Sequence, residues 1–201
     1  MYLPIGDIRD RRYLIGTMES RKLFLGILAA ATCLSAADAP TGSNWKDLVS
    51  RSIPLYGHRN WIVVADSAYP DQSASGIETV VSHADQIQVV QYILDALSKS
   101  KHVRPNIYTD QELKFLEEKD AFGISAYRES LAALLQDRKV NVLPHEQIIA
   151  KLDEVSRTFH VLIIKTNLAL PYTSVFMQLE CAYWPDEAEQ RLRAAMRGHP
   201  K

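Results

Sequence analysis

The stretch LYGHRNWIVVADSAYP, residues 55–70, contains the run that decides the fold. Its centre, WIVVA at 61–65, has five apolar residues in succession, three of them β-branched. A continuous apolar run of this length indicates a strand that is covered on both faces, because a half-exposed strand would alternate with polar residues. The run ends on Asp66. In an open α/β sheet, ligands bind at the carboxyl ends of strands, so this acid is a candidate site residue.

The rest of the chain alternates strand-like and helical patterns. HVLIIKTN at 160–167 is a second buried strand, and residues 85–100 carry an apolar stripe at helical spacing. Further helices are expected at 45–50, 111–122, 125–136, 145–158 and 186–197, and further strands at 77–81, 106–109, 139–144 and 174–180. Asp110 is expected to cap the helix at 111–122. The class is therefore α/β: a single domain with a mostly parallel central sheet flanked by helices.

Composition and motifs exclude several function classes. The 201 residues suit one domain, and the charge of −1 gives no support for a nucleic-acid surface. Cys33 and Cys181 are too few for a disulfide framework and lack metal-ligand spacing. No HxH, HExxH, GxSxG, P-loop or GxGxxG pattern occurs in the sequence. We therefore expect no metal site, no serine nucleophile and no dinucleotide cofactor.

The first forty residues have the pattern of an export signal. From Met18 the sequence reads MESRKLFLGILAAATCLSAADAP, with Arg21 and Lys22 before an apolar core of 12 residues at 23–34. Such a core is too short to span a bilayer, and small residues at positions 37 and 39 suit a signal peptidase. An amphipathic anchor would need a polar face, which the segment lacks. We expect 18–39 to be a signal peptide and 1–17 an upstream extension, both removed, leaving a periplasmic or secreted domain at 40–201 without a membrane segment.

Several polar residues are candidates for chemistry, each with a plainer alternative. Asp66 either caps its loop through an Asx turn or binds a ligand, and the two roles are compatible. His58 precedes the strand at 61–65, and His145 follows Pro144 at the start of a helix. Either imidazole is a proton carrier or an ordinary polar residue. The hydroxyls of Tyr172 and Ser174 either hold a polyol or belong to a turn.

Four short motifs occur in a characteristic order: GH at 57–58, DSAYP at 66–70, HEQ at 145–147 and PYTS at 171–174. Together, over about residues 47–180, they resemble the ribose pyranase and fucose mutarotase family. The resemblance implies a cofactor-independent isomerase that opens and recloses the ring of a free monosaccharide. It also implies a ring-shaped homo-oligomer with sites between neighbouring subunits.

Roles follow from the resemblance, motif by motif. His58 would be the proton donor, Asp66 and His145 would hold or relay protons at the sugar, and Tyr172, Thr173 and Ser174 would bind hydroxyls. The late asparagine of the family is Ser174 here, which has one fewer hydrogen-bonding group. A carbohydrate-binding oligomer without catalysis is therefore the alternative function.

One distance limits the arrangement. His58 and Asp66 are eight residues apart with a strand between them, and an extended span of that length measures roughly 26 Å. One small sugar can contact both only if the chain turns back at 59–60 or if two subunits meet at the site. The resemblance favours two subunits, so we expect the segment around Tyr172 to face a neighbour.

Overall fold

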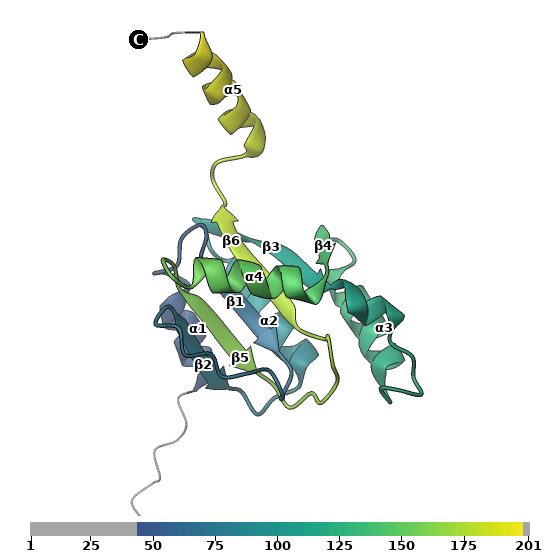
Figure 1. Cartoon of the computed structure of the whole chain (residues 1–201). Coiled ribbons are helices and arrows are strands. Elements are labelled where there is room, and N and C mark those ends of the chain that lie inside the picture. Colours follow the sequence, from purple (N-terminus) through teal and green to yellow (C-terminus); the bar gives the residue numbers. More distant parts are fainter. Residues whose placement is uncertain (1–43, 199–201) are drawn as a thin grey trace, which may run out of the picture. The chain divides into compact units, whose positions relative to one another are not determined.

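The structure is a computed structural model, and it describes residues 44–198. Its centre is a six-stranded sheet in the order β2-β5-β1-β6-β3-β4 (Figure 1). The strands are β1 (Trp61–Ala65), β2 (Ile77–Val81), β3 (Val103–Asp110), β4 (Val140–Leu143), β5 (Val161–Lys165) and β6 (Val175–Cys181). β6 is antiparallel to its neighbours β1 and β3, and every other pairing is parallel. The predicted α/β class with a mostly parallel sheet is confirmed.

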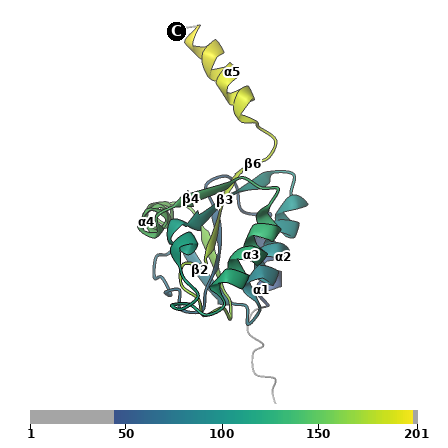
Figure 2. The same ribbon diagram turned by 90° about the vertical axis from the view of Figure 1, so that its right-hand side faces the viewer.

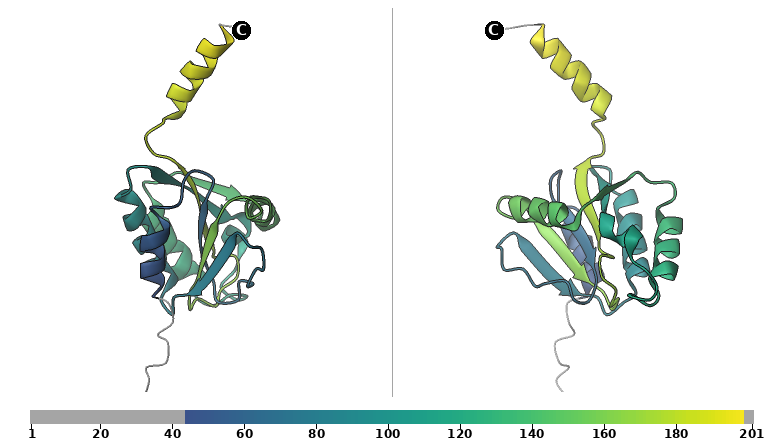
Figure 3. Two further views of the ribbon diagram at one scale, coloured as in Figure 1. Left: turned by 90° about the vertical axis from the view of Figure 1, so that its left-hand side faces the viewer. Right: turned by 45° about the vertical axis from the view of Figure 1, so that its right-hand side comes forward.

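Helices cover both faces of the sheet, as predicted. α1 (Trp45–Ser52), α2 (Gln86–Ser98) and α3 (Ile124–Leu135) lie on one face, and α4 (His145–Val155) crosses the other (Figures 2 and 3). The helix α5 (Asp186–Arg197) buries none of its residues. No helix within residues 44–198 has the length and apolar character needed to cross a membrane.

The alternation of β1 side chains explains why its sequence is apolar throughout. Ile62 and Val64 enter the core beneath α1, α2 and α3, whereas Trp61, Val63 and Ala65 enter the core beneath α4. From α4, Ile148 and Leu152 are fully buried in this second core. Burial of each such side chain contributes about 1.5–3 kcal/mol, so these two residues fix α4 on the sheet.

The region after β3 differs from its prediction. β3 runs over Val103–Asp110 rather than 106–109, because Val103–Thr109 pair with β6. The helix expected at 111–122 is only a short 3₁₀ helix, η1 (Gln111–Phe115). Asp110 stands at the N-cap position but accepts no capping hydrogen bond, so the predicted cap is wrong. Its carboxyl group contacts His145 instead.

The topology brings the functional candidates to one edge of the sheet. The carboxyl ends of β1, β3, β4 and β5 lie at the edge where the antiparallel β6 begins. Loops after β1 and β3, the start of α4 and the segment before β6 therefore meet there.

The fold requires a residue without a Cβ at Gly76, just before β2. A Cβ at this position would collide with the carbonyl oxygen of Ser156 and would lie 2.6 Å from that of Phe159. Both obstacles are backbone atoms, and the Gly76 carbonyl also accepts the N–H of Val161 at 2.8 Å. We predict that Gly76→Ala lowers the free energy of unfolding by about 2–3 kcal/mol.

Urea denaturation followed by circular dichroism measures this loss. Gly57→Ala is the matched control, since no atom lies within 4 Å of a Cβ built there. Equal stability of the two variants would contradict the described packing of β2 against the turn after α4.

Candidate functional site

Three predicted site residues meet at one cavity. The cavity has a volume of about 560 Å³ and is lined by the loop after β1, the first turns of α4 and the segment before β6. These elements contribute Asp66, His145 and Tyr172, respectively. The carboxyl edge of the sheet thus gathers a carboxylate, an imidazole and a phenol from a stretch of sequence that spans residues 66–172.

Asp66 closes the loop that follows β1. Its Oδ1 accepts the backbone N–H of Ala68 at 2.9 Å, which forms the predicted Asx turn. Within residues 44–198, Oδ2 of Asp66 accepts no hydrogen bond, and the side chain is half-buried at the cavity wall. The turn therefore orients the carboxylate and leaves one oxygen for a ligand.

His145 is held at three points. Its Nδ1 lies 3.1 Å from Oδ1 of Asp110, and its backbone N–H donates to the carboxylate of Glu112 at 3.0 and 3.1 Å. Its ring meets the ring of Tyr172 edge to face, with centroids 5.4 Å apart and planes at 85°. Pro144 offers α4 no side-chain cap, so Glu112 caps the helix from a neighbouring element. Nε2 is the remaining polar atom of the imidazole.

Asp110 is a candidate site residue that the sequence analysis did not identify. Its side chain is 0% exposed, and its Oδ2 has no hydrogen-bond partner in the described part of the chain. Burial raises the pKa of this carboxyl to about 6, although the neighbouring His145 opposes the rise. Like Asp66, Asp110 is an acid at the end of a strand, and this pattern could have identified it. It was instead interpreted as a helix cap.

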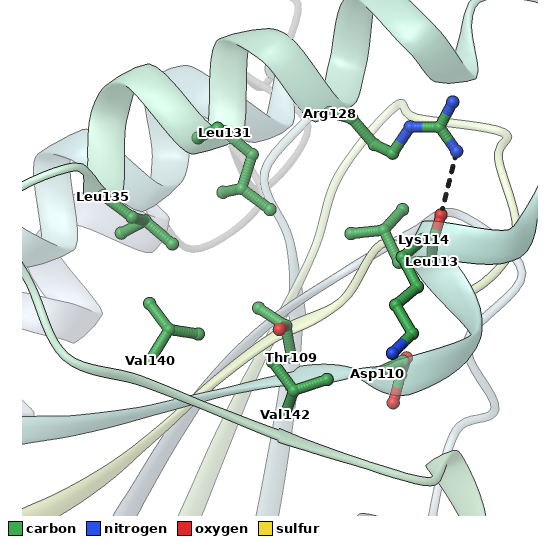
Figure 4. A pocket seen from close by; sticks show the side chains of 10 residues that line it. Thr109, Asp110, Leu113, Lys114, Arg128, Leu131, Leu135, Val140 and Val142 are labelled. Atoms are coloured by element: carbon green, nitrogen blue, oxygen red, sulfur yellow. Dashed lines mark hydrogen bonds between the residues drawn. The ribbon is translucent and has the colours of Figure 1, made fainter.

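The surroundings of Asp110 explain its desolvation. On the side of α3 it borders an apolar groove of about 360 Å³ (Figure 4). The groove is lined by Leu113, Leu131, Leu135, Val140 and Val142. Arg128 also lines the groove, and its guanidinium donates to the carbonyl of Leu113 at 3.2 Å rather than to Asp110 (Figure 4). The carboxyl therefore borders mainly apolar side chains, with Lys114 also in the groove lining, and within residues 44–198 its one ion pair is with His145 (Figure 4).

Tyr172 sits on a strained turn that a buried network supports. Its φ is +55°, a left-handed value that is costly for a bulky residue. The next carbonyl, that of Thr173, accepts from Gln86 at 2.5 Å and from the Tyr127 hydroxyl at 2.6 Å. The amide oxygen of Gln86 in turn accepts from the Thr166 hydroxyl at 2.9 Å. This network fixes the turn and so directs Tyr172 to the cavity.

The structure places the other predicted residues elsewhere. Thr173 and Ser174 are buried and do not line the cavity. His58 is exposed at the opposite end of β1 from Asp66, where it lines a different hollow with Arg104 and Gln178. Tyr172, which we expected to face a neighbouring subunit, contacts His145 of its own chain. The roles of His58, Thr173 and Ser174 in sugar binding and catalysis stay predictions.

The described residues contain no group of three or more His, Cys, Asp or Glu side chains placed to hold a metal ion. The cavity chemistry is that of proton carriers and hydroxyl-binding groups. A carboxylate, an imidazole and a phenol can exchange protons with a bound hydroxyl, and the aromatic ring of Tyr172 offers an apolar face.

Comparison of folds finds similar solved structures. One is RbsD of Bacillus subtilis complexed with D-ribose, with 16% identity, a TM-score of 0.48 and coverage of 66% of this chain and 91% of that one. Another is the fucose mutarotase of Streptococcus pneumoniae in complex with L-fucose, with 16% identity, a TM-score of 0.44 and coverage of 65% and 89%. FucU of Bifidobacterium longum has 14% identity, a TM-score of 0.46 and coverage of 67% and 94%.

These structures belong to the family that the four sequence motifs resemble. No family model matches the sequence. A comparison with curated proteins finds no match either. At such identities the similarity is one of fold, and the fold class itself rests on the strand order and pairing described above.

The raised pKa of Asp110 has a consequence for stability. Because the folded state holds the proton more tightly than the unfolded state, the stability contribution of this carboxyl falls as the pH rises from about 4 to about 6 and is constant above. We predict that Asp110→Asn, which stays uncharged, gains about 1–3 kcal/mol of unfolding free energy relative to the parent protein between pH 4 and pH 7.

Urea titrations of both proteins at several pH values measure the difference. Asp71→Asn is the control, because it removes a carboxylate at an exposed position. A difference between Asp110→Asn and the parent that is independent of pH would show that the Asp110 carboxyl titrates normally.

Proposed function

We propose that the protein opens and recloses the ring of a free monosaccharide, exchanging anomers or pyranose and furanose forms. One observation carries the proposal: Asp66 and His145 line the same cavity, and a fully buried acid supports the imidazole. Ring opening needs one group to accept a proton and another to donate one, and these residue types perform general acid–base catalysis. The ordered motifs of the sequence favour the same reaction.

The reaction is balanced by two proton transfers. Asp66 accepts the proton of the anomeric hydroxyl, the bond between the anomeric carbon and the ring oxygen breaks, and the carbonyl group forms. His145 donates a proton to the released ring oxygen. Closure on either face of the carbonyl, or through another hydroxyl, reverses both transfers and gives the exchanged product. Neither group is consumed, so the cycle needs no co-reactant.

Other side chains are suited to holding the sugar. Tyr172 presents its ring and hydroxyl at the cavity wall, where an aromatic face packs on a sugar ring and the hydroxyl binds one of its oxygens. Glu146 also lines the cavity and can accept hydrogen bonds from sugar hydroxyls. The buried Gln86 network restricts the turn that carries Tyr172, which would limit the sugars that fit.

His58 enters the proposal only through a second chain. Its position at the far end of β1 places it away from Asp66 in one subunit. We propose that a homo-oligomer brings His58 of one subunit to the cavity of another, as the family resemblance implies. A carbohydrate-binding oligomer without catalysis is the second candidate, favoured if no such contact forms.

Exchange NMR tests the activity. With the purified full chain and D-ribose, L-fucose, D-galactose and D-glucose, we expect faster anomer or ring exchange for at least one sugar. Asp66→Asn and His145→Gln should each lower the enhancement by about 10²-fold or more, the usual contribution of a general acid or base. Asp71→Asn and His160→Gln are matched controls at exposed positions outside the cavity, and should keep full activity.

Two outcomes would count against the enzyme. Saturation transfer that shows binding of a sugar without any faster exchange would favour the binding oligomer. Equal rates for the cavity variants and their controls would remove Asp66 and His145 from the reaction.

We also propose that the protein is exported, with the signal at 18–39; this segment lies outside the described residues. Its pattern predicts a mature chain that begins at Pro40. Intact mass spectrometry of the protein from a secreting host should give the mass of residues 40–201. A product that retains residues 18–39 would contradict cleavage.

A further inference from the structure

The pairing of His145 with Asp110 has the geometry of a proton relay. Asp110 lies behind the imidazole, with Oδ1 3.1 Å from Nδ1, and its side chain is wholly buried. It cannot touch a ligand in the cavity directly. Any effect of this acid on a bound sugar must therefore pass through the ring of His145, whose Nε2 is not engaged by another described residue.

A purely structural role for Asp110 would require it to satisfy backbone donors. It stands at the N-cap position of η1 and yet accepts no N–H there, and Glu112 takes the N–H at the start of α4. Among the described residues, the contact between Oδ1 and Nδ1 of His145 is the one hydrogen bond of the Asp110 side chain, because Oδ2 is unpartnered. Burying an isolated carboxylate costs folding free energy, and the contact with the His145 imidazole offsets that cost for Asp110.

We propose that Asp110 is a positioning residue that lets His145 donate a proton from Nε2 while its imidazole stays neutral. Before transfer, the Asp110 carboxyl is protonated and donates to Nδ1, and the ring carries its proton on Nε2. As Nε2–H gives its proton to the sugar ring oxygen, the Asp110 proton moves to Nδ1. The pair then consists of a carboxylate and an Nδ1–H imidazole, and ring closure reverses each step. This inference rests on the proposed function.

The burial of Asp110 and the charges around the pair together set where the pair holds its proton. Asp66 faces it from the loop after β1, Glu112 from η1 and Glu146 from the first turn of α4. Tyr69 lines the same cavity, and Lys114 is the cation of η1 that borders the groove beside Asp110. Asp66 and Glu112 disfavour ionisation of Asp110, but a carboxylate does not favour a neutral imidazole over an imidazolium. The full burial of the Asp110 side chain is what opposes a separation of charge across the pair.

The state of His145 can be read without any sugar. In the full chain labelled with ¹⁵N-histidine, the signals of His145 are identified by their loss in His145→Gln. At pH 8 we expect the proton on Nδ1, with Nε2 unprotonated. As the pH falls to 5.5, we expect the proton to appear on Nε2 and Nδ1 to lose its own, a change of tautomer rather than formation of an imidazolium.

Variants separate positioning from general stability. Asp110→Asn keeps the shape but cannot exchange a proton, so the change of tautomer should disappear and the sugar exchange rate should fall by about 10²-fold or more. Glu112→Gln, whose amide oxygen can still accept the α4 N–H, should keep the change of tautomer.

The outcomes distinguish the two proposals. An Nε2–H imidazole at pH 8, or an ordinary imidazolium titration that is the same in Asp110→Asn, would overturn the relay even if sugar exchange is fast. The predicted change of tautomer in a protein that accelerates no sugar would support the pairing and overturn the proposed function alone.

Discussion

The contact between Asp110 and His145 is the interaction on which the site depends. It joins the end of β3 to the start of α4 across 3.1 Å, and it places an acid with no exposed side-chain surface behind an imidazole at a cavity wall. Without the imidazole, the buried carboxyl would lack an ionic partner; without the carboxyl, the ring would lose the group that engages its Nδ1. Burial raises the pKa of the Asp110 carboxyl, and the imidazole beside it borders the cavity.

The fold supplies this contact through its topology. Five parallel strands end at one edge, and the single antiparallel strand β6 begins there, so the turn with Tyr172 arrives beside His145. The fully buried Ile148 and Leu152 hold α4 on the sheet, while Glu112 caps its first turn from η1. The position of α4, the orientation of the imidazole and the strained turn at Tyr172 thus depend on one another, and proton transfer to a sugar is the chemistry that we propose for them.

Local pattern predicted most of this fold, and the misses have physical causes. The runs at 61–65 and 161–165 identified β1 and β5 because a strand covered on both faces must be apolar throughout. Asp66 was predicted as a site residue because it comes directly after the first of these strands. The length of β3 depends on pairing with β6, about seventy residues away, which no local pattern contains. Asp110 was misread because a capping acid and a buried acid look alike until the chain folds. The left-handed turn at Tyr172 likewise follows from hydrogen bonds to Thr173 made by α2 and α3.

A crystal structure of the protein with a bound monosaccharide, D-ribose or L-fucose, tests the central claim most directly. The account predicts that the anomeric hydroxyl and the ring oxygen lie within hydrogen-bond reach of the Asp66 carboxylate and of Nε2 of His145, with Tyr172 against the sugar ring. A sugar bound beside His58 alone, or in the groove beneath α3, with the cavity between Asp66 and His145 filled only by water, would contradict it.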